Sequence, residues 1–353
     1  MCKLGMILVI AFLMTSVADA QPKSLFYMTE GTSSIQSFVA HADKVDVLVP
    51  TWYSVDADGL LFGGPDELVM QTAKQHHVPV MPIVVNHTIP PAKSGFSQDG
   101  FHQLAANASA RQRFITAMVN ECTKHGYSGF QFDFENVLWT DRDALSDFVK
   151  EAATALHKAR LQLSIASVPN SPGFPGHGGF GRWIYSNWRG AYDLAALAQS
   201  VDLICLMTYD EHTAYTPPGP VAGYSWTLDN LEYALKYVPK EKLSLGIPLY
   251  GYHWYAGDPG IENRSAETAA SVGANDIQLM LQTYHPQVEW DAADRSSWFY
   301  FYRDQTREWV FYTDARTFRE RYDLVKDRGL EGFCSWVLGQ EDPAIWDALP
   351  EHR

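Results

Sequence analysis

The stretch Gly129-Phe130-Gln131-Phe132-Asp133-Phe134-Glu135-Asn136 is the most informative part of the sequence. Aromatic and polar residues alternate strictly along it, as in a β-strand, so Gln131, Asp133 and Glu135 share one face. That face ends in two carboxylates and carries no cation to compensate them. Residues two apart on a strand lie about 6.5–7 Å apart. In a partly dry site, one ionised carboxylate therefore raises the pKa of the other.

Two interpretations of this stretch are possible. Two carboxylates held by a rigid strand can supply a proton donor and a stabilising anion from chemically similar groups. The alternative is an edge strand with one solvated face, but such faces usually mix Thr, Lys and Ser, which are absent here. The pattern therefore favours a catalytic acid pair at Asp133 and Glu135.

The N-terminus has the pattern of a secretory signal. Residues 4–17 are almost wholly apolar, Lys3 precedes them, and Ala18-Asp19-Ala20 follows as a small-x-small cleavage site. The apolar run is too short for a comfortable membrane span. We therefore expect residues 1–20 to be a signal peptide and residues 21–353 to form one catalytic unit. The product is expected to be secreted or periplasmic, monomeric and free of the membrane.

Composition limits the classes of partner. The chain is 46% hydrophobic and 13% aromatic, enough for a sizeable core, and its 11 Trp and 18 Tyr also suit sugar rings. The net charge of −14 argues against nucleic acid and anionic membrane surfaces.

Nothing in the sequence indicates a cofactor. Of four Cys, Cys2 leaves with the signal, and the odd remainder implies no disulfide framework. The 12 His show no metal-ligand spacing, so no metal site is predicted. Residues 176–181 fit GxGxxG, but they follow prolines and no convincing helix comes after them, so a flexible loop over the site is expected rather than a nucleotide fingerprint.

Strand and helix patterns alternate along the mature chain. Strands are predicted at 24–28, 45–50, 78–86, 129–135, 161–168, 201–209, 242–250 and 332–338. Helices lie between most of them, for example at 65–76, 110–125, 141–159, 227–237 and 315–327. Eight strands alternating with helices predict an α/β fold, a (β/α)8 TIM barrel, which needs ~250 residues. The surplus lies at about 253–311, where two strands and a helix predict a small α+β insertion after strand seven.

Catalytic groups of such barrels lie at the carboxyl ends of the strands. On the sixth strand a period of two places Cys205, Met207 and Tyr209 on one face. Tyr209 is either a hydroxyl donor at the barrel mouth or a core tyrosine. Tyr250 ends the seventh strand as a core or rim aromatic. Trp336 ends the eighth, either as a flat floor for a pyranose ring or as core filler.

Together these residues resemble family 18 glycoside hydrolases over nearly the whole mature chain. The family motif DGxDxDxE on the fourth strand matches Asp133 and Glu135, while Ser128 and Gln131 replace its first and middle Asp. The strand-six motif Met-x-Tyr-Asp is matched completely by residues 207–210, and the strand-eight Trp by Trp336. Residues 134–136, 207–212, 219–222 and 338–343 further resemble the spore-germination, cortex-lytic branch (YaaH-like).

The resemblance implies roles for these residues. Glu135 would protonate the glycosidic oxygen, and the substrate's own 2-acetamido oxygen would attack the sugar, the exception to two-carboxylate catalysis. Asp133 would orient the acetamide and Tyr209 would hydrogen-bond its oxygen. Substrate would be held by Asp210, Trp336, Met207, Gln131 and Tyr250. Because Gln131 cannot share a proton, Asp133 is expected to stay ionised more firmly than in the family.

The implied substrate is a β-1,4-linked N-acetylglucosamine polysaccharide, with cell-wall peptidoglycan ahead of chitin. Two alternatives remain open at this point. One is a chitinase-like lectin that binds such glycans without cleaving them, and the other is an endo-N-acetylglucosaminidase acting on N-glycans. The presence of Glu135 favours a hydrolase over a lectin, because lectins of the family typically lose that acid.

Overall fold

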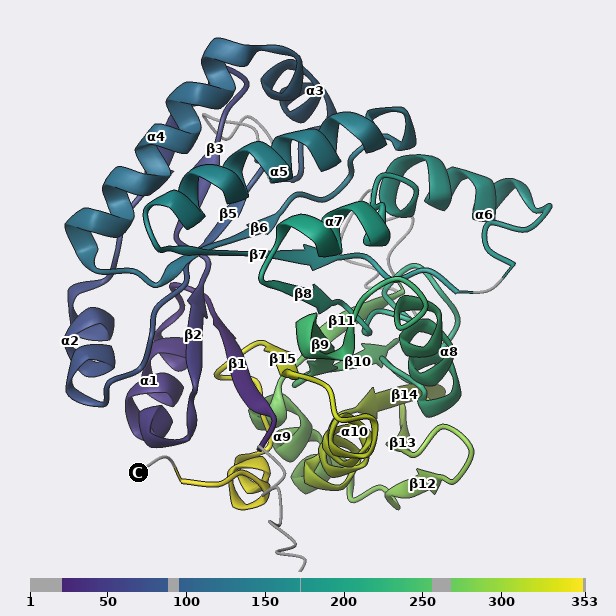
Figure 1. The fold of residues 1–353 in the computed structure, drawn as a ribbon. Coiled ribbons are helices and arrows are strands. Elements are labelled where there is room, and N and C mark those ends of the chain that lie inside the picture. Colours follow the sequence, from purple (N-terminus) through teal and green to yellow (C-terminus); the bar gives the residue numbers. More distant parts are fainter. Residues whose placement is uncertain (1–20, 88–94, 172, 256–267, 352–353) are drawn as a thin grey trace, which may run out of the picture.

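The chain folds into a closed barrel of parallel strands (Figure 1). The computed structural model describes residues 21–87, 95–171, 173–255 and 268–351. The barrel strands are β1 (Lys23–Met28), β2 (Val47–Pro50), β5 (Ile83–Val85), β6 (Gly129–Asp133), β7 (Gln162–Ser167), β8 (Leu203–Leu206), β9 (Leu243–Pro248) and β15 (Gly332–Trp336). Each pairs in parallel with its neighbour, and a bridge between Leu48 and Val80 closes the circle. The predicted (β/α)8 barrel is thus confirmed.

Helices surround the barrel. They are α1 (Thr32–His41), α2 (Glu67–Gln75), α3 (Gln98–Ala106), α4 (Ala108–His125), α5 (Arg142–Lys158), α7 (Leu194–Ser200), α8 (Tyr224–Ala234) and α10 (Ala315–Arg328). Short helical turns lie at Ala42–Lys44, Trp139–Asp141, Tyr185–Arg189, Lys240–Lys242 and Pro343–Ala348. None of the helices in the described ranges is long and apolar enough to cross a membrane. The expected signal peptide lies outside the described residues.

The alternation along β6 explains how the central strand is fixed. Phe130, Phe132 and Phe134 point outward and are fully buried between barrel and helices. The ring of Phe132 stacks on that of Phe148 from α5 with centroids 5.7 Å apart, and on that of Phe134 at 4.6 Å. Because the aromatic face is buried outside, the polar face of the same strand must point into the barrel.

The barrel interior is mixed in polarity. Its apolar part contains Leu25, Tyr27, Val49, Ile83, Cys205, Cys334 and Val337. Gln131 and Ser164 are buried in the interior as well. Cys122, Cys205 and Cys334, the cysteines among the described residues, are buried free thiols.

Two features of the barrel differ from the sequence prediction, and the insertion has five strands where two were predicted. A hairpin of β3 (Tyr53–Val55) and β4 (Leu61–Gly63) extends the sheet beyond β5, and its three-residue strands are too short to show alternation. The prediction that no helix follows the glycine-rich stretch is wrong, because α6 (Gly179–Ile184) begins within it.

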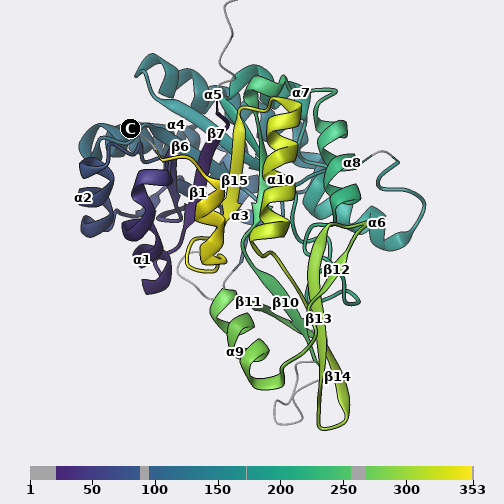
Figure 2. The same ribbon diagram turned by 90° about the horizontal axis from the view of Figure 1, so that it is seen from below.

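The insertion is a second, antiparallel sheet that projects from the barrel as an arm (Figure 2). Its elements are β10 (Gly251–Trp254), β11 (Ala269–Val272), α9 (Ala274–Tyr284), β12 (Glu289–Asp291), β13 (Ser296–Arg303) and β14 (Thr306–Tyr312). The buried side chain of Arg321 in α10 binds the backbone at the base of this arm. Its guanidinium donates to the backbone carbonyls of Asp294 and Arg295 at 2.9 and 3.0 Å, and to that of Ala222.

Candidate active site

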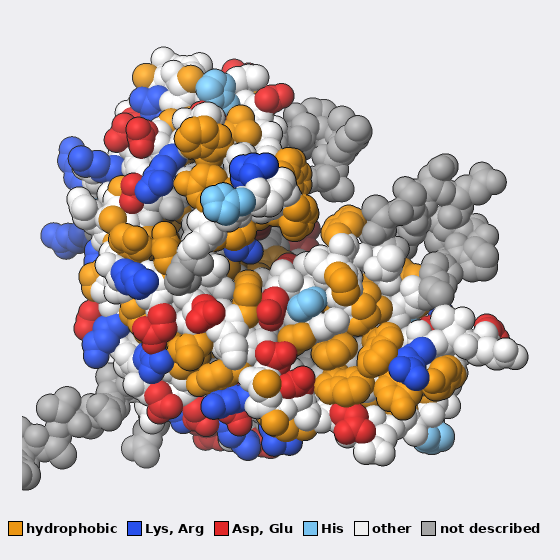
Figure 3. Space-filling view, turned by 90° about the vertical axis from the view of Figure 1, so that its right-hand side faces the viewer, with side chains coloured by type: hydrophobic (Ala, Val, Ile, Leu, Met, Phe, Trp, Pro, Cys, Tyr) orange, Lys and Arg blue, Asp and Glu red, His pale blue; other side chains and the backbone are white. Residues whose placement is uncertain are grey.

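The strand ends bring the two motif carboxylates together at the barrel mouth. Asp133 is the last residue of β6 and is buried, whereas Glu135 lies two residues beyond and is partly exposed. Their carboxyl groups form a side-chain hydrogen bond, which requires one proton between them. Figure 3 looks onto this side of the molecule and shows a hollow with acidic side chains inside it.

Glu135 is held in place by its backbone. The side-chain amide of Asn86, which follows β5, accepts from Glu135 N at 3.1 Å and donates to Glu135 O at 2.9 Å. The buried Tyr192 hydroxyl donates to Phe134 O at 2.6 Å. With neighbouring carbonyls and an amide fixed in this way, the segment after β6 has little freedom to reorient.

A third carboxylate, Asp210, lies beside this pair. It follows β8 with φ of 61°, in the left-handed region where Asp is among the residues most often found. Its Oδ1 accepts from Tyr250 Oη at 2.6 Å and from Tyr252 Oη at 3.2 Å. The Asp210 charge acts on Glu135 directly, because it is one of the groups that raise the pKa of Glu135.

The charges of all three carboxylates act on Tyr209. Burial, the Cys334 thiol and the charges of Asp133, Glu135 and Asp210 raise its pKa well above the ordinary value. The phenol therefore remains a neutral hydrogen-bond donor at any physiological pH. Its ring lies edge-on to that of Tyr250, with centroids 6.5 Å apart.

The remaining predicted residues occupy different depths. Trp336 ends β15 partly exposed, and its ring packs on Tyr27 with centroids 5.5 Å apart. Met207 is buried directly after the end of β8. Gln131 is fully buried in the barrel interior, where its amide donates to Ser164 Oγ at 2.9 Å and to Cys205 Sγ at 3.2 Å. Gln131 thus binds the interior rather than presenting its amide nitrogen to the barrel mouth.

The expectation that Asp133 stays ionised more firmly than in the family is a comparison between proteins and stays a prediction. Burial raises the pKa of Asp133 to about 7, although the hydrogen bond from Glu135 lowers it. The Gln131 amide nitrogen is engaged with Ser164 and Cys205, and Asp133 Oδ1 is buried without a hydrogen-bond partner in the described structure.

The shared proton belongs to Glu135. Burial, then Asp133, then Asp210 raise the pKa of Glu135 well above its ordinary value, and the hydrogen bond to Asp133 acts in the same direction. The same bond lowers the pKa of Asp133. Above about pH 7 the pair therefore consists of a neutral Glu135 and an ionised Asp133, which is an acid beside an anion.

We expect a bell-shaped dependence of kcat/KM on pH. Activity falls as pH drops below about 7, because Asp133 becomes neutral. It also falls at high pH, when Glu135 loses its proton. Asp210→Asn removes a negative charge that raises the Glu135 pKa, so the alkaline limb should move to lower pH while the acidic limb stays. Asp229→Asn, on the exposed side of α8, is the matched control and should move neither.

Asn86→Ala should lower kcat about 10- to 100-fold, because displacing a reacting group by ~1 Å is enough to cost 10²-fold. The control is Asn107→Ala, which removes the N-cap of α4 and costs about 1 kcal/mol of stability without touching Glu135. Steady-state kinetics and thermal unfolding of both variants separate the two effects. Equal kcat values for both variants would show that the Asn86 contacts do not position Glu135.

Sequence reasoning missed three residues of this site. Asn86 ended a predicted strand, so its position was a usable signal. Tyr252 followed the seventh predicted strand and could have been found in the same way. Tyr192 lies in a loop between α6 and α7, and nothing in the local sequence points to its contact with Phe134.

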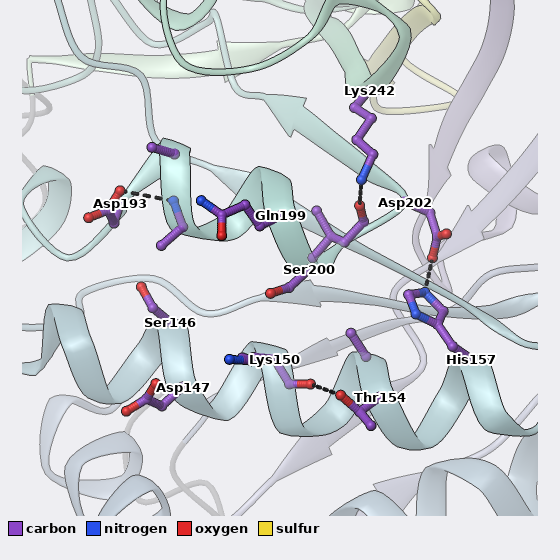
Figure 4. A pocket seen from close by; sticks show the side chains of 14 residues that line it. Ser146, Asp147, Lys150, Thr154, His157, Asp193, Gln199, Ser200, Asp202 and Lys242 are labelled. Atoms are coloured by element: carbon purple, nitrogen blue, oxygen red, sulfur yellow. Dashed lines mark hydrogen bonds and ion pairs between the residues drawn. The ribbon is translucent and has the colours of Figure 1, made fainter.

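A separate polar groove lies on the outside of the barrel, between α5 and α7 (Figure 4). The Asp202 carboxylate lies 2.8 Å from His157 Nε2 in this groove, and Lys242 Nζ donates to Val201 O at 2.9 Å. His157, Asp202 and Lys242 are thus already engaged in contacts within the protein. In the described ranges, no group of three or more His, Cys, Asp or Glu is arranged to hold a metal ion.

A (β/α)8 barrel with an acid pair and aromatic side chains at its strand ends is an arrangement that suits a glycoside hydrolase. The sequence profile described as "Glycosyl hydrolases family 18" matches residues 23–341. The chain therefore belongs to glycosyl hydrolase family 18.

Similar proteins include a cortical fragment-lytic enzyme and a chitinase. An uncharacterized glycosylase of Bacillus subtilis (YvbX) is 24% identical over 94% of this chain and 92% of its own. The cortical fragment-lytic enzyme of the same organism is 25% identical over 85% of this chain and 66% of its own. The crystal structure of a Chromobacterium violaceum chitinase superposes with a TM-score of 0.81 and 27% identity, covering 93% of this chain and 97% of that one.

Proposed function

We propose that the protein hydrolyses β-1,4-linked N-acetylglucosamine glycans by substrate-assisted, retaining catalysis, with peptidoglycan preferred to chitin. The observation that carries this proposal is the pair of carboxyl groups of Asp133 and Glu135 at the end of β6, where burial raises the pKa of both. The likeness to a cortical fragment-lytic enzyme supports the wall substrate. We also propose export through residues 1–20.

The reaction needs one acid and one anion from the protein. Glu135 donates its proton to the glycosidic oxygen as the bond from that oxygen to the anomeric carbon breaks. The substrate's acetamide oxygen forms the new bond to that carbon, giving an oxazolinium ion. Asp133 accepts a hydrogen bond from the acetamide N–H, and its negative charge stabilises the positively charged oxazolinium ring. Water then attacks the anomeric carbon and breaks its bond to the acetamide oxygen, which opens the oxazolinium ring. The Glu135 carboxylate takes the proton from that water.

The neighbouring side chains position the sugar. Tyr209, which stays protonated, donates to the acetamide oxygen and holds it near the anomeric carbon. Asp210 accepts from a sugar hydroxyl, and Tyr250 fixes its orientation. Trp336 supplies a partly exposed ring at the end of β15 for the apolar face of the pyranose.

The test is to incubate the purified protein with peptidoglycan, chitin oligomers and an N-glycosylated protein, and to analyse the products by mass spectrometry. Reducing-end N-acetylglucosamine fragments from peptidoglycan are expected to form fastest. Release from chitin alone would overturn the preference, and release only from the glycoprotein would make the enzyme an endo-N-acetylglucosaminidase. Glycan binding with no fragments from any substrate would make it a lectin.

We expect the β configuration to be retained, because the acetamide route displaces twice at the anomeric carbon. Proton NMR of the reaction within the first turnovers, before mutarotation, reports the anomer released. An initial α product would exclude the proposed route.

A further inference from the structure

Three carboxamide side chains form a hydrogen-bonded bridge beside Glu135. The Gln98 amide nitrogen donates to Asn136 Oδ1 at 2.9 Å and to Asn187 Oδ1 at 3.0 Å. Asn136 directly follows Glu135 in the chain. Gln98 is the first residue of α3, and Asn187 lies in the π-helix Tyr185–Arg189. The bridge, called here the amide clamp, therefore joins the segment after β6 to the segments that follow β5 and β7.

The direction of these hydrogen bonds is fixed by the backbone. Asn136 Nδ2 donates to Phe96 O at 3.2 Å, and Asn187 Nδ2 donates to Trp183 O at 2.8 Å. A carbonyl oxygen only accepts, so each asparagine turns its own side-chain oxygen toward Gln98. The Gln98 amide nitrogen must then donate one hydrogen to each asparagine. A side chain that only accepts hydrogen bonds could not take its place.

The clamp joins two segments whose backbone has uncommon conformations. Asn136 has a φ of 52°, in the left-handed region where Asn is several-fold enriched. In the π-helix, Gly190 N donates to Tyr185 O at 2.7 Å, a hydrogen bond that spans five residues. Single turns of π-helix are rare and frequently lie at functional sites. The π-helix carries the Asn187 side chain that completes the clamp.

The clamp adds to the contacts that Asn86 makes with the same segment. Asn86 binds the backbone N and O of Glu135, and the clamp binds the side chain of the next residue. The two sets of bonds are connected, because Ser97, which precedes Gln98, donates from its N to Asn86 O at 2.7 Å. The segment that carries the acid is therefore held on consecutive residues.

Removing the clamp should cost little stability. Gln98, Asn136 and Asn187 are all partly exposed. Water can therefore hydrogen-bond the groups that lose a partner, and no buried polar group is left unsatisfied. Water does not hold the two loops at a fixed separation, so the loss falls on the position of the segment.

We propose that Gln98 is a positioning residue for Glu135 and acts through the amide clamp by fixing where the Glu135 carboxyl group points. The inference rests on the proposed function, because Glu135 is the acid of that reaction. A reacting group displaced by ~1 Å can lose about 10²-fold in rate. Since the clamp binds the residue next to Glu135, its loss should impair proton donation more than sugar binding.

The experiment compares two substrates that differ in their need for a proton. The leaving group of an N-acetylglucosamine tetrasaccharide is a sugar, which must be protonated. The dinitrophenyl glycoside of the matching disaccharide releases a stable phenolate without help from an acid. Gln98→Met removes both donors and adds no charge. It should lower kcat on the tetrasaccharide about tenfold or more and leave KM within about twofold.

Turnover of the dinitrophenyl glycoside by Gln98→Met should stay close to the wild-type value. Gln103→Met, the same change at an exposed position of α3, is the matched control and should alter neither substrate. Thermal unfolding of both variants shows that they are folded. Wild-type kcat of Gln98→Met on the tetrasaccharide would overturn the proposal, and so would an equal loss on both substrates.

A double-mutant cycle tests whether the clamp acts as a unit. Asn187→Ala should lower kcat on the tetrasaccharide in the otherwise wild-type protein. It should cause no further loss in the Gln98→Met background, because the bond between the two side chains is already absent there. Asn120→Ala, at an exposed position of α4, is its control. Additive losses from Gln98→Met and Asn187→Ala would show that the clamp does not act as a unit.

Hydrogen exchange separates this inference from the proposed function. Backbone amides of residues 134–138 should exchange faster in Gln98→Met than in Gln103→Met, because the segment is no longer held. If the wild-type protein cleaves no glycan, the proposed function fails. Faster exchange would then still support the clamp, whereas unchanged exchange would overturn it.

Discussion

Glu135→Gln is expected to lower turnover by about 10²–10⁴-fold, the usual cost of losing general acid help. The amide keeps the size and shape of the side chain, so the backbone contacts with Asn86 persist. It cannot donate a proton to the leaving oxygen. The variant should therefore still bind glycan and remain folded.

The comparison is made with Glu67→Gln, the same chemical change at an exposed position in the first turn of α2. Initial rates on chitin oligomers, the affinity for the same oligomers and thermal unfolding are measured for both variants. Wild-type turnover in Glu135→Gln would remove Glu135 from the mechanism. A loss of binding equal to the loss of rate would instead point to a role in holding substrate.

Removing the acetyl groups from the substrate should abolish cleavage. The acetamide oxygen is the proposed nucleophile, and a nucleophile held within the same molecule corresponds to effective molarities of about 10⁵–10⁸ M. No described side chain is assigned to replace it, because Asp133 is required beside Glu135 as the anion. A deacetylated polymer has nearly the same size and linkage but lacks the reacting atom.

The measurement is the release of reducing ends from chitin oligomers and from fully deacetylated oligomers of equal length. Partly acetylated oligomers serve as an internal control, since products should carry an acetylated sugar at the new reducing end. Comparable release from the acetylated and the fully deacetylated series would overturn the substrate-assisted mechanism, and would require a nucleophile from the protein.

The fold was predictable because its signals are local. The alternation around Phe132 fixed the direction of β6, and the repeated strand and helix patterns specified the barrel. The β3–β4 hairpin escaped prediction because three-residue strands show no period. Tyr252 and Asn86 lie at the ends of strands, where an inspection of every strand end would have found them.

The electrostatics of the site could not be obtained from sequence. The pKa of Asp133 depends on how deeply the barrel mouth buries it, which is decided by residues far away in the chain. Asp210 acts on Glu135 only because the end of β8 returns beside β6, two strands away in the sheet. The sequence showed which groups were present but not the distances that shift their pKa values.

The buried amide of Asn86 has a consequence for production of the enzyme. Asn86-His87-Thr88 is an Asn-x-Thr acceptor for N-linked sugar. In the folded protein Asn86 is 2% exposed and its nitrogen is bound to Glu135 O, so no oligosaccharide fits there. A eukaryotic secretory host that modifies the chain before it folds would therefore yield a population unable to close this segment. Thr88→Ala removes the acceptor and leaves the amide intact.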